Sequence, residues 1–434
     1  MYPNLYYVFK DLFGMEVPFL RYVNSFGFFV ALAFILAAVV LTIELKRKSK
    51  LLQPTEVEVM VGKPATTSEI LVNFLLGFLL GYKILGLFLM SSSATDDPQA
   101  FIFSTIGNWP AGIILGLFFA GLKWWEKNRQ KLPKPEKRKL RIWPHDRVGE
   151  ITIIALVFGL LGAKLFDIFE NWSDFLKHPS DYLLSPAGLT FYGGLICATL
   201  AIWWYARKNQ IGMRHLADAA APALMMAYAV GRIGCQVAGD GDWGIYNSAY
   251  ATDSTGVVTR AMPGQFDATL KENATYYLNH FDVDSLSEVP HKGFVKPDWM
   301  SFLPDWVIAY DYPHNVNEEG MRLAGCTDEK FCNHLPIPVY PTPFYETIVC
   351  LLLFGGLWAF RKRMKMPGQM FSVYLILNGL ERFLIEKIRV NNKLDWGSIK
   401  PTQAEIISAS LVLLGVSLFL YLRNKDKKEK MSTD

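Results

Sequence analysis

Long apolar runs constrain the fold of this chain more than any other feature. Nine runs of about 16–22 residues carry almost no charge, which is long enough to cross a hydrocarbon core of about 30 Å as helices. Only 19% of the residues are charged, against about a quarter in a soluble chain. We therefore predict an all-α integral membrane protein with about nine transmembrane helices. The runs lie near 27–44, 70–91, 108–125, 150–170, 189–206, 216–238, 345–360, 368–386 and 403–422.

Basic residues gather in alternate loops between these runs. They follow the first, third, fifth and seventh runs and fill the C-terminal tail, within 46–50, 127–147, 207–214, 361–365 and 423–430. The loops between them are short and acidic or neutral, as at 92–97, although 387–402 is an exception with four basic residues. By the positive-inside rule, the basic loops face the cytoplasm. The pattern predicts an outer N-terminus and a cytoplasmic C-terminus.

Two segments are expected to lie on the outer side. Residues 1–26 are rich in Tyr and Phe and suit an interfacial segment, with a frayed terminus as the alternative. Residues 245–340 form the one long hydrophilic stretch, but their aromatic residues need burial, so we expect a mixed α/β or irregular insert. Cys326 and Cys332 in this insert are a candidate disulfide. A zinc site is less favoured, because no second ligand pair is evident.

Four charged residues fall within the outer half of the predicted membrane region. They are Arg232, Glu346, Arg382 and Glu386. Charges at this depth are costly and usually pair or line a functional cavity. Arg382 and Glu386 are four residues apart on one helix face and can pair, with a purely structural ion pair as the alternative. Arg232 and Arg382 lie on different helices and would repel each other unless an anion lies between them, and the guanidinium fork suits phosphate.

Three short stretches near these charges have two interpretations each. The glycines of 231-GRIG-234 leave room for a lipid head group or simply let helices pack closely. Tyr192 in 189-LTFYGGLI-196 is either a site hydroxyl or an interfacial anchor. The prolines of 340-YPTPFYE-346 either fix a rigid, non-helical entry that aims Tyr345 and Glu346 inward, or Glu346 is an acidic residue favoured at a helix start.

Taken together and in order, these stretches resemble the prolipoprotein diacylglyceryl transferase family. Residues 231–244 (GRIGCQVAGDGDWG) are similar to the family signature GRIGNFxNGExxG with one residue added, and 190–196 to its HGG stretch. Residues 340–346 are similar to HPSQLYE, and 381–389 to FRxxxExxR. The resemblance covers about 150–240 and 340–423, and the first span more loosely. Residues 50–148 and most of 245–340 have no counterpart in it. It implies seven family-like helices, with an extra pair within residues 50–148.

The resemblance implies transfer of a diacylglyceryl group from phosphatidylglycerol to the lipobox cysteine thiol of a prolipoprotein signal peptide. A thioether forms and glycerol 1-phosphate leaves, in the inner (plasma) membrane of a bacterium, with no cofactor, metal or nucleic acid. Arg232 matches the phosphatidylglycerol-binding arginine, Arg382 a second essential arginine, and Glu386 its carboxylate partner; Tyr192 is a further catalytic candidate. The other candidate substrate-binding residues are Gly193, Gly194, Gly231, Gly234, Gln236, Asp240, Asp242, Tyr345, Glu346 and Arg389.

The chain departs from the family pattern at four positions. Tyr192 and Tyr340 replace histidines, Cys235 replaces an asparagine, and Asn378 replaces a tyrosine. None of the histidines lies in a predicted span, so a tyrosine, a carboxylate or the cationic field itself would activate the thiol. Cys235 is not expected to be a nucleophile, because the substrate supplies the thiol.

These interpretations divide the chain into seven parts. They are an interfacial segment (1–26), the first membrane helix (27–44), the extra helix pair with basic loops (45–148), the first part of the catalytic core (149–244), the outer insert (245–340), the second part of the core (341–423) and a basic cytoplasmic tail (424–434).

Three other functions are weighed against this one. A lipid or anion transporter would show inverted repeats, and the chain has a faint echo between 79-LLGYKILGLF-88 and 160-LLGAKLFDIF-169, either a duplication or a coincidence. A membrane phosphotransferase would need an aspartate-rich metal motif longer than residues 240–242. A non-catalytic receptor would be built around residues 245–340.

Overall fold

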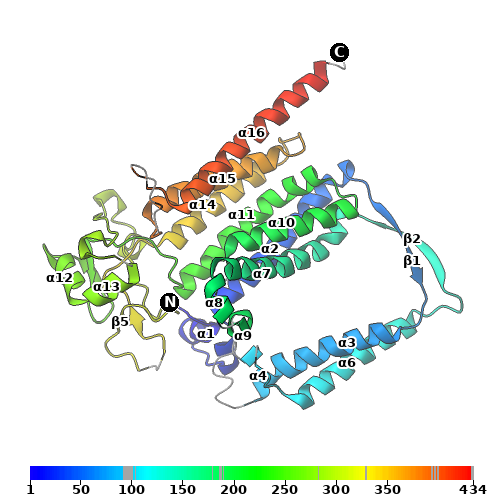
Figure 1. Cartoon of the computed structure of the whole chain (residues 1–434), viewed down its shortest axis with the longest axis horizontal. Helices are drawn as coiled ribbons and strands as arrows, with labels where there is room; N and C mark the ends of the chain where they lie inside the picture. The colour runs from blue at the N-terminus through cyan, green and yellow to red at the C-terminus, as the bar shows by residue number, and fades with distance from the viewer. Residues whose placement is uncertain are drawn as a thin grey trace. The chain divides into compact units, whose positions relative to one another are not determined.

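The structure is a computed structural model and is mostly helical (Figure 1). It describes all residues except 91–100, 103, 178, 185–187, 189, 282, 328–329, 392–393, 395–396, 398–399 and 432–434. The chain forms two compact units. Unit 1 contains residues 1–44 and 214–434, and unit 2 contains residues 45–213. Residues 149–213, expected in the catalytic core, thus belong to unit 2.

Each predicted apolar run is helical. The helices are α2 (Ser25–Arg47), α3 (Thr67–Leu79) continued by the π-helix Leu80–Leu85 and α4 (Gly86–Leu89), α6 (Trp109–Arg129), α7 (Val148–Glu170), α10 (Phe191–Lys208), α11 (Met213–Ala238), α14 (Thr342–Phe360), α15 (Gln369–Ile385) and α16 (Gln403–Met431). Within the described residues, five segments are long and apolar enough to cross a membrane: 25–51, 67–89, 144–170, 342–360 and 403–426. A helical, multi-pass membrane protein is confirmed, and the count of nine spans stays a prediction.

Unit 2 holds two helical hairpins, α3 with α6 and α7 with α10 (Figure 1). Glycines bring the helices of each hairpin into backbone contact. A Cβ on Gly77 of α3 would lie 2.5 Å from the Leu115 carbonyl oxygen, and one on Gly162 of α7 would lie 2.5 Å from the Gly193 carbonyl oxygen. Such small residues allow the close approach that associates helices in lipid, where no hydrophobic force acts between them. Two short helices, α8 (Trp172–Lys177) and α9 (Pro179–Leu184), follow α7.

The two echoing stretches occupy the same place in the two hairpins. Gly81 and Gly162 both pack against the second helix of their hairpin. Lys83 donates to the carbonyl oxygens of Phe101 and Ile106, at 3.0 and 2.7 Å, in the chain leading to α6. Lys164 donates to the Gly188 carbonyl oxygen at 3.5 Å, in the chain leading to α10. The shared packing and anchoring favour a duplication over a coincidence.

An antiparallel ribbon of two strands also belongs to unit 2. Strand β1 (Thr55–Val61) pairs with β2 (Glu136–Ile142), and Thr55 lies opposite Ile142. We expected only an extra helix pair and basic loops between residues 45 and 148. The alternation of 55-TEVEVMV-61 is the local signal for the first strand.

In unit 1, α15 packs against both α14 and α16 (Figure 1). Small and sulfur-containing residues of α11, including Ala221 and Met225, meet Cys350 of α14 and Met370 of α15 in a buried cluster. These contacts join α11, α14 and α15 in one bundle. The charged residues lie near the start of α14 and toward the ends of α11 and α15.

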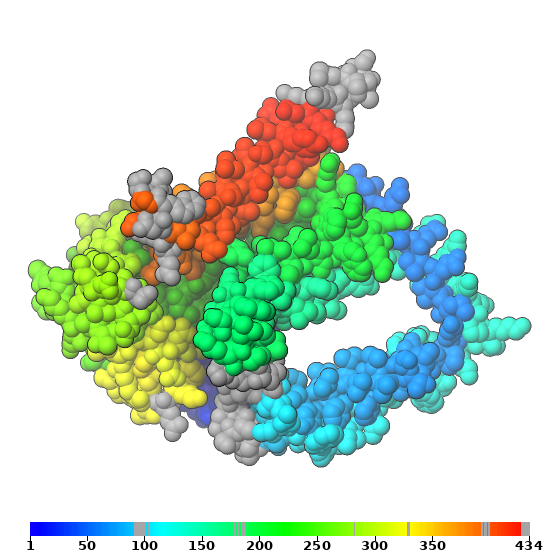
Figure 2. Space-filling model, in the orientation of Figure 1, coloured from blue at the N-terminus to red at the C-terminus, as the bar shows by residue number. Residues whose placement is uncertain are grey.

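Residues 245–340 form an ordered insert beyond the ends of α11 and α14 (Figures 1 and 2). Its elements are β3 (Tyr250–Thr252), β4 (Val258–Arg260), α12 (Gln265–Glu272), α13 (Ala274–Phe281), β5 (Met321–Arg322) and β6 (Asn333–His334), with several single 3-10 turns. Its core is aromatic, with Tyr246, Tyr277 and Tyr312 almost fully buried. The candidate disulfide is present: Cys326 is bonded to Cys332, with the Cα atoms 5.8 Å apart.

The N-terminal segment carries α1 (Leu5–Phe13) and a 3-10 turn (Pro18–Tyr22). The amide of Tyr2 donates to the Val237 carbonyl oxygen of α11 at 2.9 Å. The Met1 amino group donates to the Pro313 carbonyl oxygen of the insert at 2.7 Å. Its first residues are therefore held by α11 and the insert; an interfacial position for the segment stays a prediction.

Candidate functional site

Arg232 lies near the end of α11, because the helix continues through 231-GRIG-234 to Ala238. The two glycines of this stretch differ. A Cβ on Gly234 would lie 2.9 Å from the Phe29 Cβ of α2, so Gly234 lets two helices pack, whereas Gly231 has open space around it. Helix packing, the alternative interpretation of these glycines, thus applies to Gly234.

The chain after α11 turns back toward Arg232. Gly239 and Gly241 have φ values of 65° and 91°, a region in which other residues are strained. The turn between them brings the Asp242 carboxylate onto the Arg232 guanidinium. The Thr342 hydroxyl donates to the Asp242 carbonyl oxygen at 3.0 Å and ties the turn to the start of α14.

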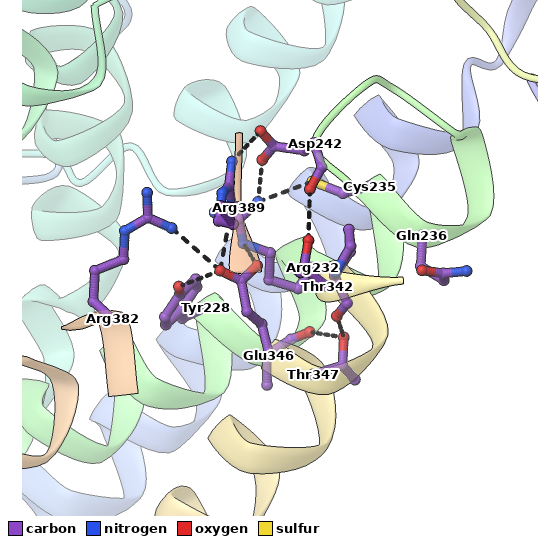
Figure 3. Close-up of polar contacts among 12 residues, drawn as sticks. Tyr228, Arg232, Cys235, Gln236, Asp242, Thr342, Glu346, Thr347, Arg382 and Arg389 are labelled. Carbon is purple, nitrogen blue, oxygen red and sulfur yellow. Dashed lines mark hydrogen bonds and ion pairs between the residues drawn. The ribbon is translucent and has the colours of Figure 1, made fainter. Parts of the chain in front are cut away.

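Glu346, in the first turns of α14, is the centre of the site (Figure 3). Its side chain is 0% exposed, and three guanidinium groups converge on it. Arg232 Nε lies 2.7 Å from one carboxylate oxygen, and Arg382 Nη1 and Arg389 Nη1 lie 3.2 and 3.3 Å from the other. The Tyr228 hydroxyl also donates to that second oxygen, at 3.3 Å.

Asp242 closes the cluster on a second side. Its two carboxylate oxygens pair with Arg232 and Arg389, and the side chain is 38% exposed (Figure 3). Burial raises the pKa of Asp242, but the charges of Arg232 and Arg389 outweigh burial, so the pKa lies below the usual value of an aspartate. Asp242 is therefore ionised at neutral pH and is the accessible carboxylate beside the fully buried Glu346.

Glu386 orients Arg382, as the sequence predicts. Its carboxylate lies 3.0 Å from Arg382 Nη2 and also accepts hydrogen bonds from Asn391 Nδ2 at 2.6 Å and the Thr402 hydroxyl at 2.7 Å. It sits in the single 3-10 turn Glu386–Ile388 that ends α15. The donors from the chain leading into α16 hold this carboxylate in place, and the carboxylate in turn holds the guanidinium.

The ion pairs of this cluster join equal numbers of arginines and carboxylates. Three arginines (Arg232, Arg382, Arg389) face three carboxylates (Asp242, Glu346, Glu386). We expected an outside anion between Arg232 and Arg382, but the protein's own Glu346 lies there. This expectation was wrong because the neutralising residue comes from α14, more than a hundred residues from α11 in sequence.

Three predicted binding residues do not contact the arginines. Gln236 accepts a hydrogen bond from the Tyr312 hydroxyl at 2.8 Å, and the Tyr345 hydroxyl donates to the Val307 carbonyl oxygen, so both bind the insert. Asp240 accepts from the Asp242 amide at 3.3 Å and shapes the turn. The entry to α14 is also less extended than expected, because the helix already begins at Thr342.

Tyr192, Gly193 and Gly194 lie in the first turn of α10, in unit 2. The two glycines pack against α7: a Cβ on Gly193 would lie 2.5 Å from the Gly162 carbonyl oxygen, and one on Gly194 would lie 2.8 Å from that of Gly159. Their visible role is helix packing. Tyr192 is half-buried beside Phe191, with ring centroids 5.8 Å apart.

The structure defines the surroundings of two positions that depart from the family pattern. The Tyr340 hydroxyl donates to the Lys292 carbonyl oxygen at 2.9 Å, and burial raises the pKa of Tyr340 to about 12. Tyr340 therefore does not act as a base at neutral pH. Cys235 is buried, and Arg232 Nη1 donates to its sulfur at 3.7 Å. No group of residues suited to a metal ion occurs in the described part of the chain.

Two residues that lie in the site were not predicted from the sequence to belong to it. Tyr228 is one turn before Arg232 on α11, and its ring lies 5.4 Å from the guanidinium carbon. Glu381 is 7% exposed in α15, with Glu346, Arg382 and Arg232 among its electrostatic partners. An acidic residue within an apolar run is the sequence signal for Glu381.

These features define a class: a helical membrane protein with an arginine–carboxylate cluster at the ends of its helices, next to an ordered insert. The sequence profile described as prolipoprotein diacylglyceryl transferase matches residues 109–421. The chain belongs to this family. The match includes α6 and β2, for which the sequence alone suggested no counterpart.

Individual relatives carry the name phosphatidylglycerol–prolipoprotein diacylglyceryl transferase. One, from Dehalococcoides mccartyi strain 195, is 25% identical over 338 residues, which cover 78% of this chain and 98% of that protein. Another, from Clostridium novyi strain NT, is 25% identical over 65% of this chain and 82% of that protein. A third, from Neisseria meningitidis serogroup C, is 26% identical over 271 residues, which cover 62% of this chain and 76% of that protein. The predicted family and transferase class are confirmed.

Proposed function

We propose that this chain transfers the diacylglyceryl group of phosphatidylglycerol to the lipobox cysteine of prolipoproteins at the cluster around Glu346. One observation supports this most strongly: three guanidinium groups converge on a buried carboxylate, and two of them also share a second, partly exposed carboxylate. Arginines held in such a geometry bind phosphate oxygens through paired hydrogen bonds.

The lipid phosphate enters by replacing Asp242. Glu346 is 0% exposed and is bound by all three arginines, so it stays in place. Asp242 is 38% exposed on a glycine turn and contacts Arg232 and Arg389 only. A phosphodiester carries one negative charge, as the carboxylate does, so the exchange leaves the net charge of the cluster unchanged. Glu346 and Glu386 hold the guanidinium groups in position during the exchange.

The transfer step then develops charge at the same place. The thiol gives its proton to the displaced Asp242 carboxylate, and the sulfur attacks the carbon of the diacylglycerol group that is bonded to the phosphate oxygen. The carbon–oxygen bond breaks, its electron pair goes to the phosphate oxygen, and glycerol 1-phosphate leaves. The phosphate gains a second negative charge, which the preorganised arginines stabilise without rearranging.

Topology and cellular location form part of the same proposal. We place nine spans in a bacterial inner membrane, with the basic loops and the C-terminus in the cytoplasm and the N-terminus outside. The insert of residues 245–340 then lies at the outer ends of α11 and α14, where secreted prolipoproteins present their lipobox cysteine. For the remaining parts of the chain, we keep the boundaries that the sequence predicts.

The exchange of Asp242 is tested by separating binding from turnover. Asp242→Asn removes the competing anion and the proton acceptor, so a short-chain phosphatidylglycerol should bind more tightly while transfer to a lipobox peptide slows. Asp240→Asn is the matched control, because Asp240 lies two residues away and forms no ion pair with the arginines in the described structure. Weaker binding in Asp242→Asn than in Asp240→Asn would contradict the exchange. Absence of transfer by the unmodified protein would refute the function itself.

A further inference from the structure

The ribbon of β1 and β2 has two chemically different faces. Directly paired residues share a face in an antiparallel ribbon. One face is apolar over the pairs of Thr55 with Ile142 and of Val57 with Leu140, and continues with Val59 and Val61, which lie opposite Arg138 and Glu136. The other face is mostly charged, with Glu56 opposite Arg141 at 3.3 Å, Glu58 opposite Lys139 and Met60 opposite Lys137. The ribbon is therefore amphipathic.

The apolar face is only partly covered by the described residues. The sheet contains only these two strands, Val57, Val59 and Val61 are partly buried, and Leu140 is 47% exposed. A two-stranded ribbon is marginally stable at best in water, and needs another surface to bury its apolar side.

The ends of the ribbon are fixed at the ends of membrane hairpins. On one side, Lys127 at the end of α6 pairs with Glu69 at the start of α3 at 3.0 Å, and each helix end lies within eight residues of its strand. On the other side, the Thr55 hydroxyl donates to the Asn209 carbonyl oxygen, just after α10, at 3.0 Å. The ribbon thus connects the same ends of the two hairpins.

Tryptophans mark the membrane boundary at these ends. Trp124 and Trp125 near the end of α6 are each 55% exposed, and the Arg129 guanidinium lies 5.5 Å from the Trp125 ring centroid. Near the end of α10, Arg207 lies over Trp203 in the same way, at 4.8 Å. Tryptophan and arginine in this arrangement are typical of the head-group level of a bilayer. The ribbon begins a few residues beyond this level.

We propose that the ribbon lies on the membrane surface and binds anionic phospholipid head groups. Its apolar face enters the boundary between head groups and acyl chains. The long basic side chains of β2, and of the residues that lead into it, reach the lipid phosphates from the edges of the ribbon. The basic residues are Lys131, Lys134, Lys137, Arg138, Lys139 and Arg141. Apolar burial and attraction of basic residues to anionic lipid act together in such interfacial elements. The lipid surface therefore supplies the cover that the protein lacks.

The two faces provide their own internal control. A photo-crosslinking amino acid is placed at Val59, on the apolar face, or at Glu58, on the charged face. The purified protein is reconstituted in nanodiscs of phosphatidylcholine with or without phosphatidylglycerol, irradiated, and analysed by mass spectrometry. We expect phospholipid adducts at position 59 and few at position 58, with more adducts when phosphatidylglycerol is present.

The contribution of the charges is tested in the same discs. Each basic residue near an anionic surface adds about fivefold to lipid binding. Lys137→Gln, Lys139→Gln and Arg141→Gln combined should remove most of the phosphatidylglycerol-dependent gain in adducts at position 59. The control removes three lysines of the insert, Lys271, Lys292 and Lys330, and should leave that gain unchanged.

Three results would overturn the proposal. They are equal adducts at positions 58 and 59, no response to phosphatidylglycerol, and crosslinks from position 59 to another polypeptide in intact cells, which would make the face a protein interface. None of these readouts depends on transferase activity, so the ribbon and the catalytic proposal are tested separately.

Discussion

The hairpins of unit 2 and the arginine cluster of unit 1 hold helices together by opposite means. In the hairpins, glycines remove side chains until backbones touch, as where Gly77 meets the Leu115 carbonyl. In the cluster, long charged side chains from α11, α14 and α15 meet at Glu346. Packing of small residues leaves no room for an added atom, whereas our proposal requires the cluster to accept a phosphate in place of the Asp242 carboxylate. We therefore interpret the hairpins as a scaffold and the arginine cluster as the candidate site.

The largest effect is expected when the central carboxylate is neutralised. Glu346→Gln keeps the shape but leaves three arginines facing two carboxylates. Removing one partner of a buried ion pair costs about 3–5 kcal/mol. Unfolding of the purified protein in detergent should show this loss, whereas Glu126→Gln, in a surface pair that is worth at most about 1 kcal/mol, should not. If both variants were equally stable, the ion pairs of Glu346 would not be what stabilises the bundle.

The second largest effect is expected when an arginine of the cluster is removed. Arg232→Ala and Arg382→Ala should each slow transfer by roughly a hundredfold to a thousandfold, because each removes a charged contact to the transition state. Arg232→Lys should recover part of the loss, since lysine keeps the charge without the fork. The structure pairs Arg232 with Asp242 and Glu346, so stability should fall as well. Near-normal transfer in both alanine variants would make these arginines structural.

The hairpins should respond to added volume instead. A Cβ on Gly116 of α6 would lie 2.9 Å from the Phe74 ring of α3, whereas one on Gly121 of the same helix meets nothing within 4 Å. Overpacking typically costs about 1–3 kcal/mol. Gly116→Leu should therefore lower the unfolding temperature relative to Gly121→Leu, which controls for helix propensity. If both variants unfold alike, close packing is not what holds this hairpin.

The smallest effect is expected at Cys235. The acceptor thiol belongs to the prolipoprotein, so Cys235→Ser should retain most transfer activity, although Arg232 loses a weak sulfur contact at 3.7 Å. The assay uses labelled phosphatidylglycerol and a lipobox peptide. A complete loss of activity, with label trapped on Cys235 in the parent protein, would reverse this assignment and make Cys235 the nucleophile.

Sequence reasoning succeeded where the signal is local. The i, i+4 spacing of Arg382 and Glu386 predicted their ion pair, and the spacing of Cys326 and Cys332 permitted their disulfide. It failed where side chains turn toward a distant partner. Gln236 and Tyr345 lie in motifs of the site, yet both point to the insert, because Tyr312 and the Val307 carbonyl are their partners.

The sequence by itself determined the helices, the family and the arginines available for the site, because apolar length and short motifs act within one segment. Only the tertiary structure decided what lies between those arginines. Glu346 reaches them from α14, and Asp242 reaches them from a glycine turn. Both contacts depend on which helix ends meet in the bundle. The pairing of buried charges is a property of that meeting, since each charge is costly at this depth until its partner arrives from another helix.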